Sequence, residues 1–150
     1  MNNANEMNQL LPGQPLRVGV DLIADKHSGA LIVIGTSNKL DKISSGGINL
    51  IDCAYSPEML SELSKMDGAI IVSGDVTKIL KANVHLNPSD SLSTSQTGTR
   101  HRTAERTAEE TDLTVITVSE ESSLVKVFNN SGTTELEEPS VILGLSLIHI

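Results

Sequence analysis

Short runs of aliphatic residues that are apolar on both faces set the strongest limit on how this chain of 150 residues can fold. Residues 30–34 are Ala-Leu-Ile-Val-Ile and are followed by Gly35, and residues 69–72 are Ala-Ile-Ile-Val. Such runs are typical of strands in a sheet that is covered on both faces, where neither face needs polar side chains. The sequence has one Tyr, one Phe and no Trp, so its core must be aliphatic. These features predict an α/β fold.

The segments between these runs carry helix signals. Residues 15–25 begin with a proline and have an apolar stripe, which predicts a helix that stops by Gly29. The hydroxyl of Ser56 and the ring of Pro57 in the first turn predict a second helix that runs to about residue 65. The other elements expected are strands at residues 48–51, 78–86, 114–119 and 124–128, a Ser/Thr-rich loop at 87–98, a helix at 99–110 and a hairpin turn at 129–132.

The two ends of the chain differ in composition from its middle. Residues 1–13 are polar and rich in Asn, and we expect them to form a loose lead-in. Residues 145–150 match the translation of a common sequencing adapter, so we expect a non-native tail and native sequence that stops near Gly144. The alternative is an apolar terminal strand. Residues 14–144 are then expected to form one domain.

The charge and the apolar runs limit the class of partner. A net charge of -8 disfavours nucleic acid and anionic membranes, because like charges repel. Three arginines nevertheless lie within seven residues, at Arg100, Arg102 and Arg106. They favour a compact anionic ligand, and a solvated helix face is the alternative. No run approaches the ~20 apolar residues of a membrane span. There is no signal-peptide pattern, and Cys53 is the only cysteine, so we expect a cytoplasmic protein without disulfides.

A carboxylate followed by glycine marks the first candidate site. Asp67-Gly68-Ala69 lies between the predicted second helix and a predicted buried strand. Glycine lets a ligand approach the backbone, and a carboxylate can bind a hard cation or polarise a hydroxyl. An ordinary Asp-Gly turn explains the same letters, and by itself this motif favours that explanation.

Arginines at a helix start mark the second candidate site. Gly98 and Thr99 would begin the predicted helix with free N–H groups, which form an anion site. Arg100 and Arg102 lie at the end of the helix dipole that disfavours cations, and a bound phosphate would account for that position. The alternative is that both arginines pair with nearby glutamates on a solvated face.

Two further polar residues are candidates. His101 lies between the two arginines, whose charges should hinder its protonation and favour a neutral hydrogen-bonding role. Ser119 ends a predicted strand, which is a typical ligand position in α/β folds. A buried or capping histidine and a turn serine are equally acceptable explanations.

Taken together and in this order, the two motifs resemble the diadenylate cyclase domain family. Asp67-Gly-Ala69 and Arg100-His-Arg102 are separated by a strand and a Ser/Thr loop, as in that family. The longer stretches 63–72, 82–86 and 97–106 are most similar to its DNA-integrity scanning branch. The similarity runs from about residue 11 to residue 144.

The resemblance implies both a fold and an activity. The fold is an α/β domain with a mixed central sheet flanked by helices, and residues 14–144 would be the catalytic domain. The activity joins two ATP molecules into cyclic di-AMP and releases two pyrophosphates. Two domains would meet face to face, each with one ATP and one Mg²⁺ or Mn²⁺, so a homo-oligomer is expected, an octamer being one form that the family suggests.

The resemblance also implies roles for particular residues. Asp67 would bind the cation and help to activate the 3′-hydroxyl of ATP, and Arg100 and Arg102 would stabilise charge in the transition state. The residues expected to bind ATP are Gly68, Ala69, Leu86, Gly98, Thr99, Arg100, His101, Arg102, Thr103 and Ser119.

Departures from the family pattern leave two alternatives open. Glu120 stands where many scanning proteins carry a basic residue. The helical linker and the DNA-binding region of scanning proteins have no counterpart here, so we expect no DNA binding from this chain. The alternatives are a non-catalytic module that binds ATP or cyclic di-AMP, and a folded but inactive fragment.

Overall fold

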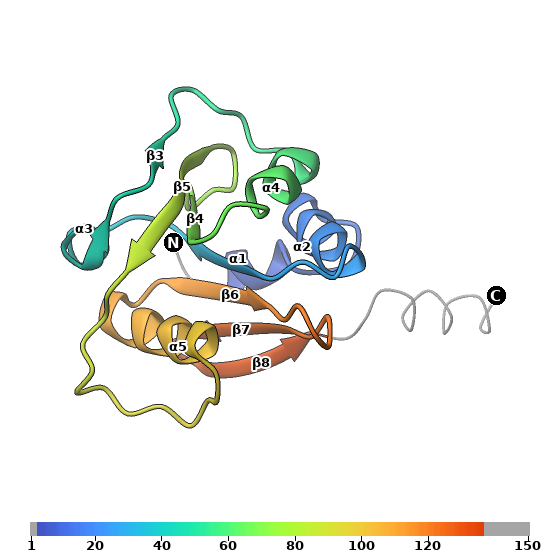
Figure 1. Cartoon of the computed structure of the whole chain (residues 1–150). Coiled ribbons are helices and arrows are strands. Elements are labelled where there is room, and N and C mark those ends of the chain that lie inside the picture. The colour runs from blue at the N-terminus through green and yellow to red at the C-terminus, as the bar shows by residue number, and fades with distance from the viewer. Residues whose placement is uncertain (1–2, 137–150) are drawn as a thin grey trace.

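The computed structural model describes residues 3–136, which form one mixed β-sheet with helices on both faces (Figure 1). The helices are α1 (Asn3–Asn8), α2 (Pro15–Asp25), α3 (Asn38–Ile43), α4 (Pro57–Leu63) and α5 (Thr99–Thr111). The strands are β1 (Ala30–Ile34), β2 (Ser44–Ser45), β3 (Ile48–Asn49), β4 (Ala69–Val72), β5 (Ile79–Leu86), β6 (Thr114–Val118), β7 (Val125–Asn129) and β8 (Gly132–Leu136).

The sheet has the order β2-β5-β4-β1-β6-β7-β8, and β3 pairs with β5 beside β2. Strands β1 and β4 are parallel, whereas the other pairs are antiparallel. Every residue of β1, β4 and β6 is buried, as the apolar runs in the sequence predicted. The α/β fold with a mixed central sheet is therefore confirmed.

Two aliphatic layers fill the space between the sheet and its helices. The larger layer lies under α2 and α4 and includes Leu16, Ile23 and Leu60, which are fully buried. The second layer lies under α3 and α5 and contains Phe128, which is 1% exposed. Because α2 and α4 cover one face and α5 the other, the ends of α4 and α5 reach the same edge of the sheet from opposite sides (Figure 1).

The predicted helix starts are found in the structure. Ser56 Oγ accepts a hydrogen bond from the backbone N–H of Met59 at 3.0 Å, and Pro57 is the first residue of α4. Pro15 is the first residue of α2. Helix α5 ends one residue later than predicted, at Thr111, with Asp112 in the left-handed conformation as its C-terminal cap.

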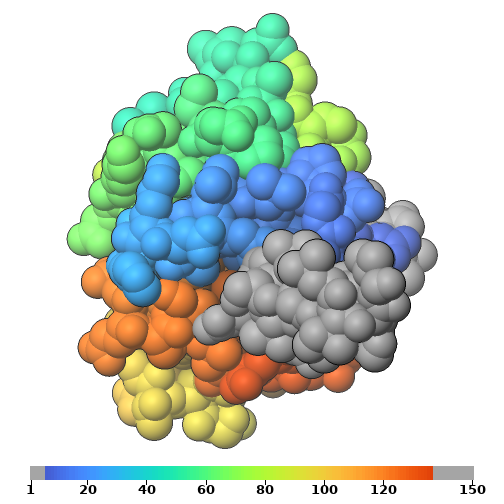
Figure 2. Space-filling view, turned by 90° about the vertical axis from the view of Figure 1, so that its right-hand side faces the viewer, coloured from blue at the N-terminus to red at the C-terminus, as the bar shows by residue number. Residues whose placement is uncertain are grey.

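The interpretation of residues 1–13 as a loose lead-in was wrong for residues 3–10. They contain α1 and pack on the domain, because Leu10 is buried and Thr114 Oγ1 donates a hydrogen bond to buried Glu6. The guanidinium of Arg17 donates to the Leu10 carbonyl at 2.9 Å and ties this segment to α2. Figure 2 shows this segment, in dark blue, beside the lighter blue of α2. Single apolar side chains in a polar stretch gave too weak a periodic signal to predict this.

Helix α3 is the second helix, after α1, that the sequence patterns did not predict. Ser37 caps it by accepting from the backbone N–H of Leu40 at 3.1 Å, and Leu40 and Ile43 are buried one turn apart. The helix is too short for a clear periodic pattern. None of the helices within residues 3–136 has the length and apolar character to cross a membrane. The expected tail at 145–150 and the domain end at 144 lie outside the described residues.

Candidate functional site

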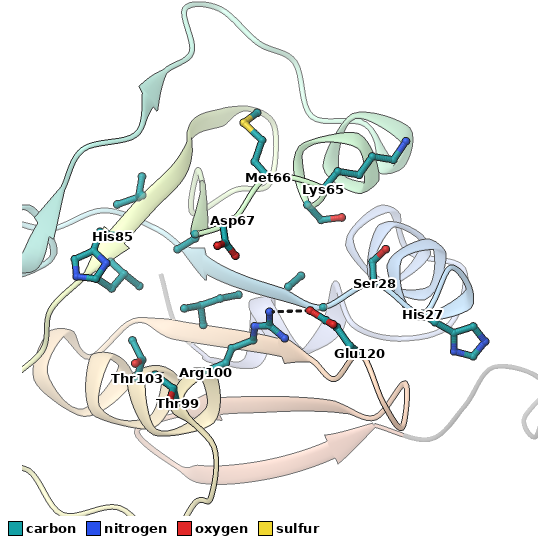
Figure 3. A pocket seen from close by; sticks show the side chains of 18 residues that line it. His27, Ser28, Lys65, Met66, Asp67, His85, Thr99, Arg100, Thr103 and Glu120 are labelled. Carbon is teal, nitrogen blue, oxygen red and sulfur yellow. Dashed lines mark hydrogen bonds and ion pairs between the residues drawn. The ribbon is translucent and has the colours of Figure 1, made fainter.

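A cavity of about 630 Å³ opens at the edge of the sheet where α4 and α5 approach each other (Figure 3). Its volume lies within the ~300–1,000 Å³ that is usual for small-molecule sites. The cavity is lined by residues 27–31 before and at the start of β1, residues 64–69 between α4 and β4, residues 84–86 at the end of β5, Thr99, Arg100 and Thr103 of α5, and Glu120 after β6.

Asp67 is held on the tight turn that leads from α4 into β4. Gly68 follows it with a φ of +97°, a backbone conformation that residues other than glycine rarely adopt. A Cβ atom at Gly68 would also lie 2.8 Å from the backbone carbon of Asn83, so there is no room for a side chain. Asn83 itself has a φ of +57° and lies where the pairing of β4 with β5 shifts register. These contacts fix the position from which the Asp67 carboxylate reaches the cavity (Figure 3).

The first turn of α5 forms the opposite wall. Gly98 is the N-terminal cap and provides no capping side chain, and the backbone N–H groups of the first turn have no acidic residue beside them. Thr99 and Arg100 reach the cavity from this turn, and the hydroxyl residue Thr103 reaches it from the next turn. A helix start with an arginine and free N–H groups favours an anion such as phosphate.

Most of the residues predicted for the site meet at this cavity. Asp67 and Arg100, 33 residues apart in the sequence, lie on facing walls (Figure 3). The predicted residues that line the cavity are Asp67, Gly68, Ala69, Leu86, Thr99, Arg100 and Thr103. The predicted residues that do not line it are Gly98, His101, Arg102 and Ser119.

Arg102 points to the Ser/Thr loop rather than to the cavity. Its Nε donates to the carbonyl of Gln96 at 3.2 Å, and one turn later Arg106 Nε donates to the carbonyl of Leu92 at 3.0 Å. The carboxylate of Glu110 accepts from the backbone N–H of Ser89 at 2.8 Å. The outer face of α5 thus holds loop 87–98 by its side chains. The phosphate contact expected of Arg102 stays a prediction.

His101 has a lowered pKa, in the expected direction. Burial is the main cause, and the nearby charges of Lys126 and Arg100 add to it. The ring is therefore biased toward its neutral form, although it does not line the cavity. Of the two flanking arginines only Arg100 contributes to the lowered pKa, and burial, which was the alternative left open, has the larger effect.

Ser119 lies in the turn after β6. Its backbone N–H donates to the Leu124 carbonyl at 3.0 Å, its carbonyl accepts from Ser123 at 3.0 Å, and its hydroxyl accepts from the Ser122 N–H at 3.4 Å. These contacts are those of a turn serine, which was one of the two explanations left open. Its role as a phosphate ligand stays a prediction.

The sequence argument missed several residues that line the cavity. Gly29 was predicted only as a helix stop, and Glu120 only as a departure from the family pattern. In the structure, Arg100 Nη2 lies 3.4 Å from Glu120 Oε1, and both side chains lie over Gly29. The position of Gly29 directly before a buried strand was the one feature of the sequence that could have marked it as a site residue. His85 and Lys65 also line the cavity; they lie in the stretches 82–86 and 63–72 that carry the family resemblance, but neither was given a role.

The residues at the cavity fit a cation that is shared with a ligand better than a cation held by protein alone. Within the described part of the chain, no group of three or more His, Cys, Asp or Glu side chains could hold a metal ion. Two carboxylates line the cavity: Asp67 lies on the turn before β4, and Glu120 is paired with Arg100 at 3.4 Å. Mg²⁺ and Mn²⁺ accept such sites, because one or two carboxylates and several phosphate or water oxygens complete their shells.

Comparison with known proteins agrees with this geometry. The family model described as "DisA bacterial checkpoint controller nucleotide-binding" matches residues 17–133. The DNA integrity scanning protein DisA of Fusobacterium nucleatum is 50% identical over 123 residues, which are 82% of this chain and 35% of that protein. The DisA protein of Clostridium tetani is 46% identical over 138 residues, or 92% of this chain and 38% of that protein. The chain thus spans just over a third of the length of these relatives.

Solved structures share the fold. The crystal structure of DacA from Staphylococcus aureus has a TM-score of 0.66 and 31% identity, over 87% of this chain and 89% of that chain. A hypothetical membrane spanning protein from Bacillus cereus has a TM-score of 0.70 over 81% of this chain and 61% of that chain, and at 23% identity it supports the fold alone. Because the family model covers most of the chain and its relatives are this similar, the chain belongs to the DAC family of DisA-type nucleotide-binding domains.

Proposed function

We propose that this chain is a diadenylate cyclase domain, which condenses two ATP molecules into cyclic di-AMP and releases two pyrophosphates. One observation carries the proposal: in a domain of this nucleotide-binding family, Asp67 and Arg100 lie on facing walls of one cavity. The cavity has the volume of a single-nucleotide site. A carboxylate opposite a helix start that favours phosphate is suited to hold a cation and the phosphates of one nucleotide together.

The proposed reaction forms and breaks one bond at each phosphorus. The 3′-oxygen of one ATP attacks the α-phosphorus of the second ATP, and the bond from that phosphorus to the bridging oxygen of the β-phosphate breaks. Pyrophosphate leaves, and the proton of the 3′-hydroxyl passes by way of Asp67 to solvent. A second, equivalent transfer closes the ring.

The walls of the cavity suggest how the nucleotide is held. Arg100 and the N–H groups at the start of α5 would bind phosphate oxygens, and Thr99 and Thr103 would add hydroxyl donors. Leu86 is 6% exposed and Ala69 is buried, and they give the opposite end an apolar surface for the adenine ring. The hydroxyl of the ribose would then face Asp67.

A divalent cation is part of the proposal. When bound to Asp67 and to phosphate oxygens, Mg²⁺ or Mn²⁺ would offset negative charge on the phosphates and lower the pKa of a bound hydroxyl. The chain's own contribution is the orientation of Asp67, which the tight turn at Gly68 fixes.

Assembly is also proposed. One cavity provides one nucleotide site, whereas the product needs two nucleotides with each 3′-oxygen facing the other's α-phosphorus. Two chains that meet face to face satisfy this need, as a homodimer or within a larger ring such as an octamer. A cytoplasmic location and the absence of DNA binding by this chain stay predictions.

The test is to incubate the purified chain with ATP and either Mg²⁺ or Mn²⁺ and to identify the products by mass spectrometry. Cyclic di-AMP and pyrophosphate are the expected products. Nucleotide binding without any product would favour the non-catalytic module. A folded monomer in gel filtration that yields no product would favour the inactive fragment.

Glu120→Gln is expected to tighten nucleotide binding. The Glu120 carboxylate lines the cavity and competes with phosphate for Arg100, to which it lies at 3.4 Å. Removing one negative charge at ~6 Å from a phosphate should raise the affinity for ATP about threefold to tenfold at low salt. The gain in affinity should shrink as salt is added, since Glu120 is exposed and Arg100 is part-exposed, so that salt screens their charges. Isothermal titration calorimetry measures this.

Glu121→Gln is the matched control, since this neighbouring carboxylate is exposed and does not line the cavity. It should change the affinity for ATP much less. Equal effects of the two substitutions would mean that only overall charge matters. An unchanged or weaker affinity in Glu120→Gln would contradict a phosphate site at Arg100.

A further inference from the structure

Gly29 is a glycine that the backbone does not require. Seven other glycines in the described residues have a φ in the left-handed region, whereas that of Gly29 lies outside it. Alanine could therefore adopt the backbone conformation at residue 29 without strain. The reason for a glycine must lie in the space around its Cα atom.

That space is filled by the side chain of Arg100. A Cβ atom at Gly29 would overlap Nη1 of Arg100 and lie 2.7 Å from its Cζ and 2.7 Å from Cγ of Glu120. Real Cβ contacts are almost never this short. The guanidinium and the carboxylate that pairs with it thus rest directly on the Gly29 backbone.

Three distant segments meet at this contact. Residue 29 precedes β1, and the antiparallel pairing of Ala30 with Val118 brings it beside the residues that follow β6, including Glu120. Arg100 reaches across from the first turn of α5 (Figure 3). The guanidinium can extend over the end of the sheet because the residue below it has no side chain.

We propose that Gly29 is a positioning residue of the phosphate site. Its lack of a side chain sets where the guanidinium of Arg100 lies, and therefore where the guanidinium meets the nucleotide phosphates. This inference rests on the proposed function, since it assigns nucleotide phosphates as the anion. Gly29 acts through Arg100 and itself contributes no charge or hydrogen-bonding side chain. A methyl group at residue 29 would leave the fold intact, because the overlapping atoms belong to the side chains of Arg100 and Glu120, which are 33% and 63% exposed and can move. It would displace the guanidinium.

The test compares a nucleotide with its nucleoside in Gly29→Ala. The probes are 3′-deoxy-ATP, which binds without turnover because it lacks the attacking hydroxyl, and 3′-deoxyadenosine, which has no phosphate. Losing a charge-assisted hydrogen bond should weaken binding of 3′-deoxy-ATP about tenfold or more. Binding of 3′-deoxyadenosine should stay unchanged. Equal weakening for both probes would show that the methyl group only obstructs the cavity, and would overturn the proposal.

Arg100→Ala supplies the second arm. If Gly29 acts through Arg100, adding Gly29→Ala to Arg100→Ala should have no further effect on the affinity for 3′-deoxy-ATP. Additive losses would overturn the proposal. Should Gly29→Ala lower the melting temperature, the double variant should recover most of the loss, because the guanidinium is gone and only the exposed side chain of Glu120 remains close to residue 29. No recovery at all would show that the methyl group does not act through Arg100, and would overturn the proposal.

The outcomes separate this inference from the proposed function. A wild-type chain that binds neither probe would contradict a nucleotide site at the cavity as a whole. A wild-type chain that binds 3′-deoxy-ATP, with the same affinity in Gly29→Ala, would overturn only the role assigned to Gly29.

Discussion

Replacing Arg100 by alanine should lower the rate of cyclic di-AMP formation about 100-fold or more, since positioned charge that stabilises a transition state typically contributes that much. Among the charged side chains of α5, Arg100 is the one that lines the cavity in the structure. Its charge would face the phosphates, where negative charge builds up as pyrophosphate leaves. The fold should survive, because the side chain is part-exposed and its ion pair with Glu120, at 3.4 Å, adds little to stability.

Arg106→Ala is the matched control for Arg100→Ala. Arg106 lies on the same helix, but its guanidinium binds the Leu92 carbonyl and lies 3.8 Å from Asp90, away from the cavity. Its loss should leave most of the turnover. Product formation is followed by mass spectrometry, and circular dichroism confirms folding. Arg100→Ala with wild-type turnover would remove the phosphate assignment.

Arg102→Ala distinguishes two roles for the second arginine. If Arg102 holds loop 87–98, as its bond to the Gln96 carbonyl indicates, its loss should reduce turnover far less than the loss of Arg100. Equal losses would instead favour the phosphate contact that the family resemblance implies. The same mass-spectrometric measurement of cyclic di-AMP decides between them.

Local patterns in the sequence were sufficient to predict the central strands and to mark Asp67 and Arg100 as candidate site residues. The aliphatic runs at 30–34 and 69–72 are buried strands, and the order of the two motifs led to one cavity. Such features are visible in sequence because each depends on a few consecutive residues. The family resemblance then supplied what spacing alone does not provide, namely that the two motifs meet.

The parts that were missed depend on contacts between distant segments. Gly29 lies under Arg100 and Glu120 only because β1 and β6 pair, and no local pattern encodes that contact. The direction of the Arg102 side chain is decided by where loop 87–98 folds back on α5. The short helix α1 is stabilised by packing and by its contact with Thr114, 108 residues away from Glu6. Sequence patterns describe single elements, and these three features are properties of element pairs.

Asp67→Asn should abolish turnover while nucleotide binding in the absence of divalent cations is retained. The two side chains have nearly the same shape, and Asp67 is exposed, so the fold and the cavity should not change. The amide cannot take the proton of the 3′-hydroxyl and is a much weaker cation ligand than the carboxylate. Turnover should fall about 1,000-fold, as when a catalytic acid–base group and part of a cation site are lost together. Mass spectrometry measures the turnover, and calorimetry measures the affinity for the nucleotide.

Asp25→Asn is the control, since this exposed aspartate ends α2 and does not line the cavity.

Mixing Asp67→Asn with wild-type chains then tests the assembly. If each cyclic product needs two competent chains face to face, activity after subunit exchange should fall as the square of the wild-type fraction. A linear fall would mean that each chain works alone. In the proposed reaction one cavity holds one nucleotide and the product contains two, so a linear result would contradict the shared site, even if Asp67 itself proved essential.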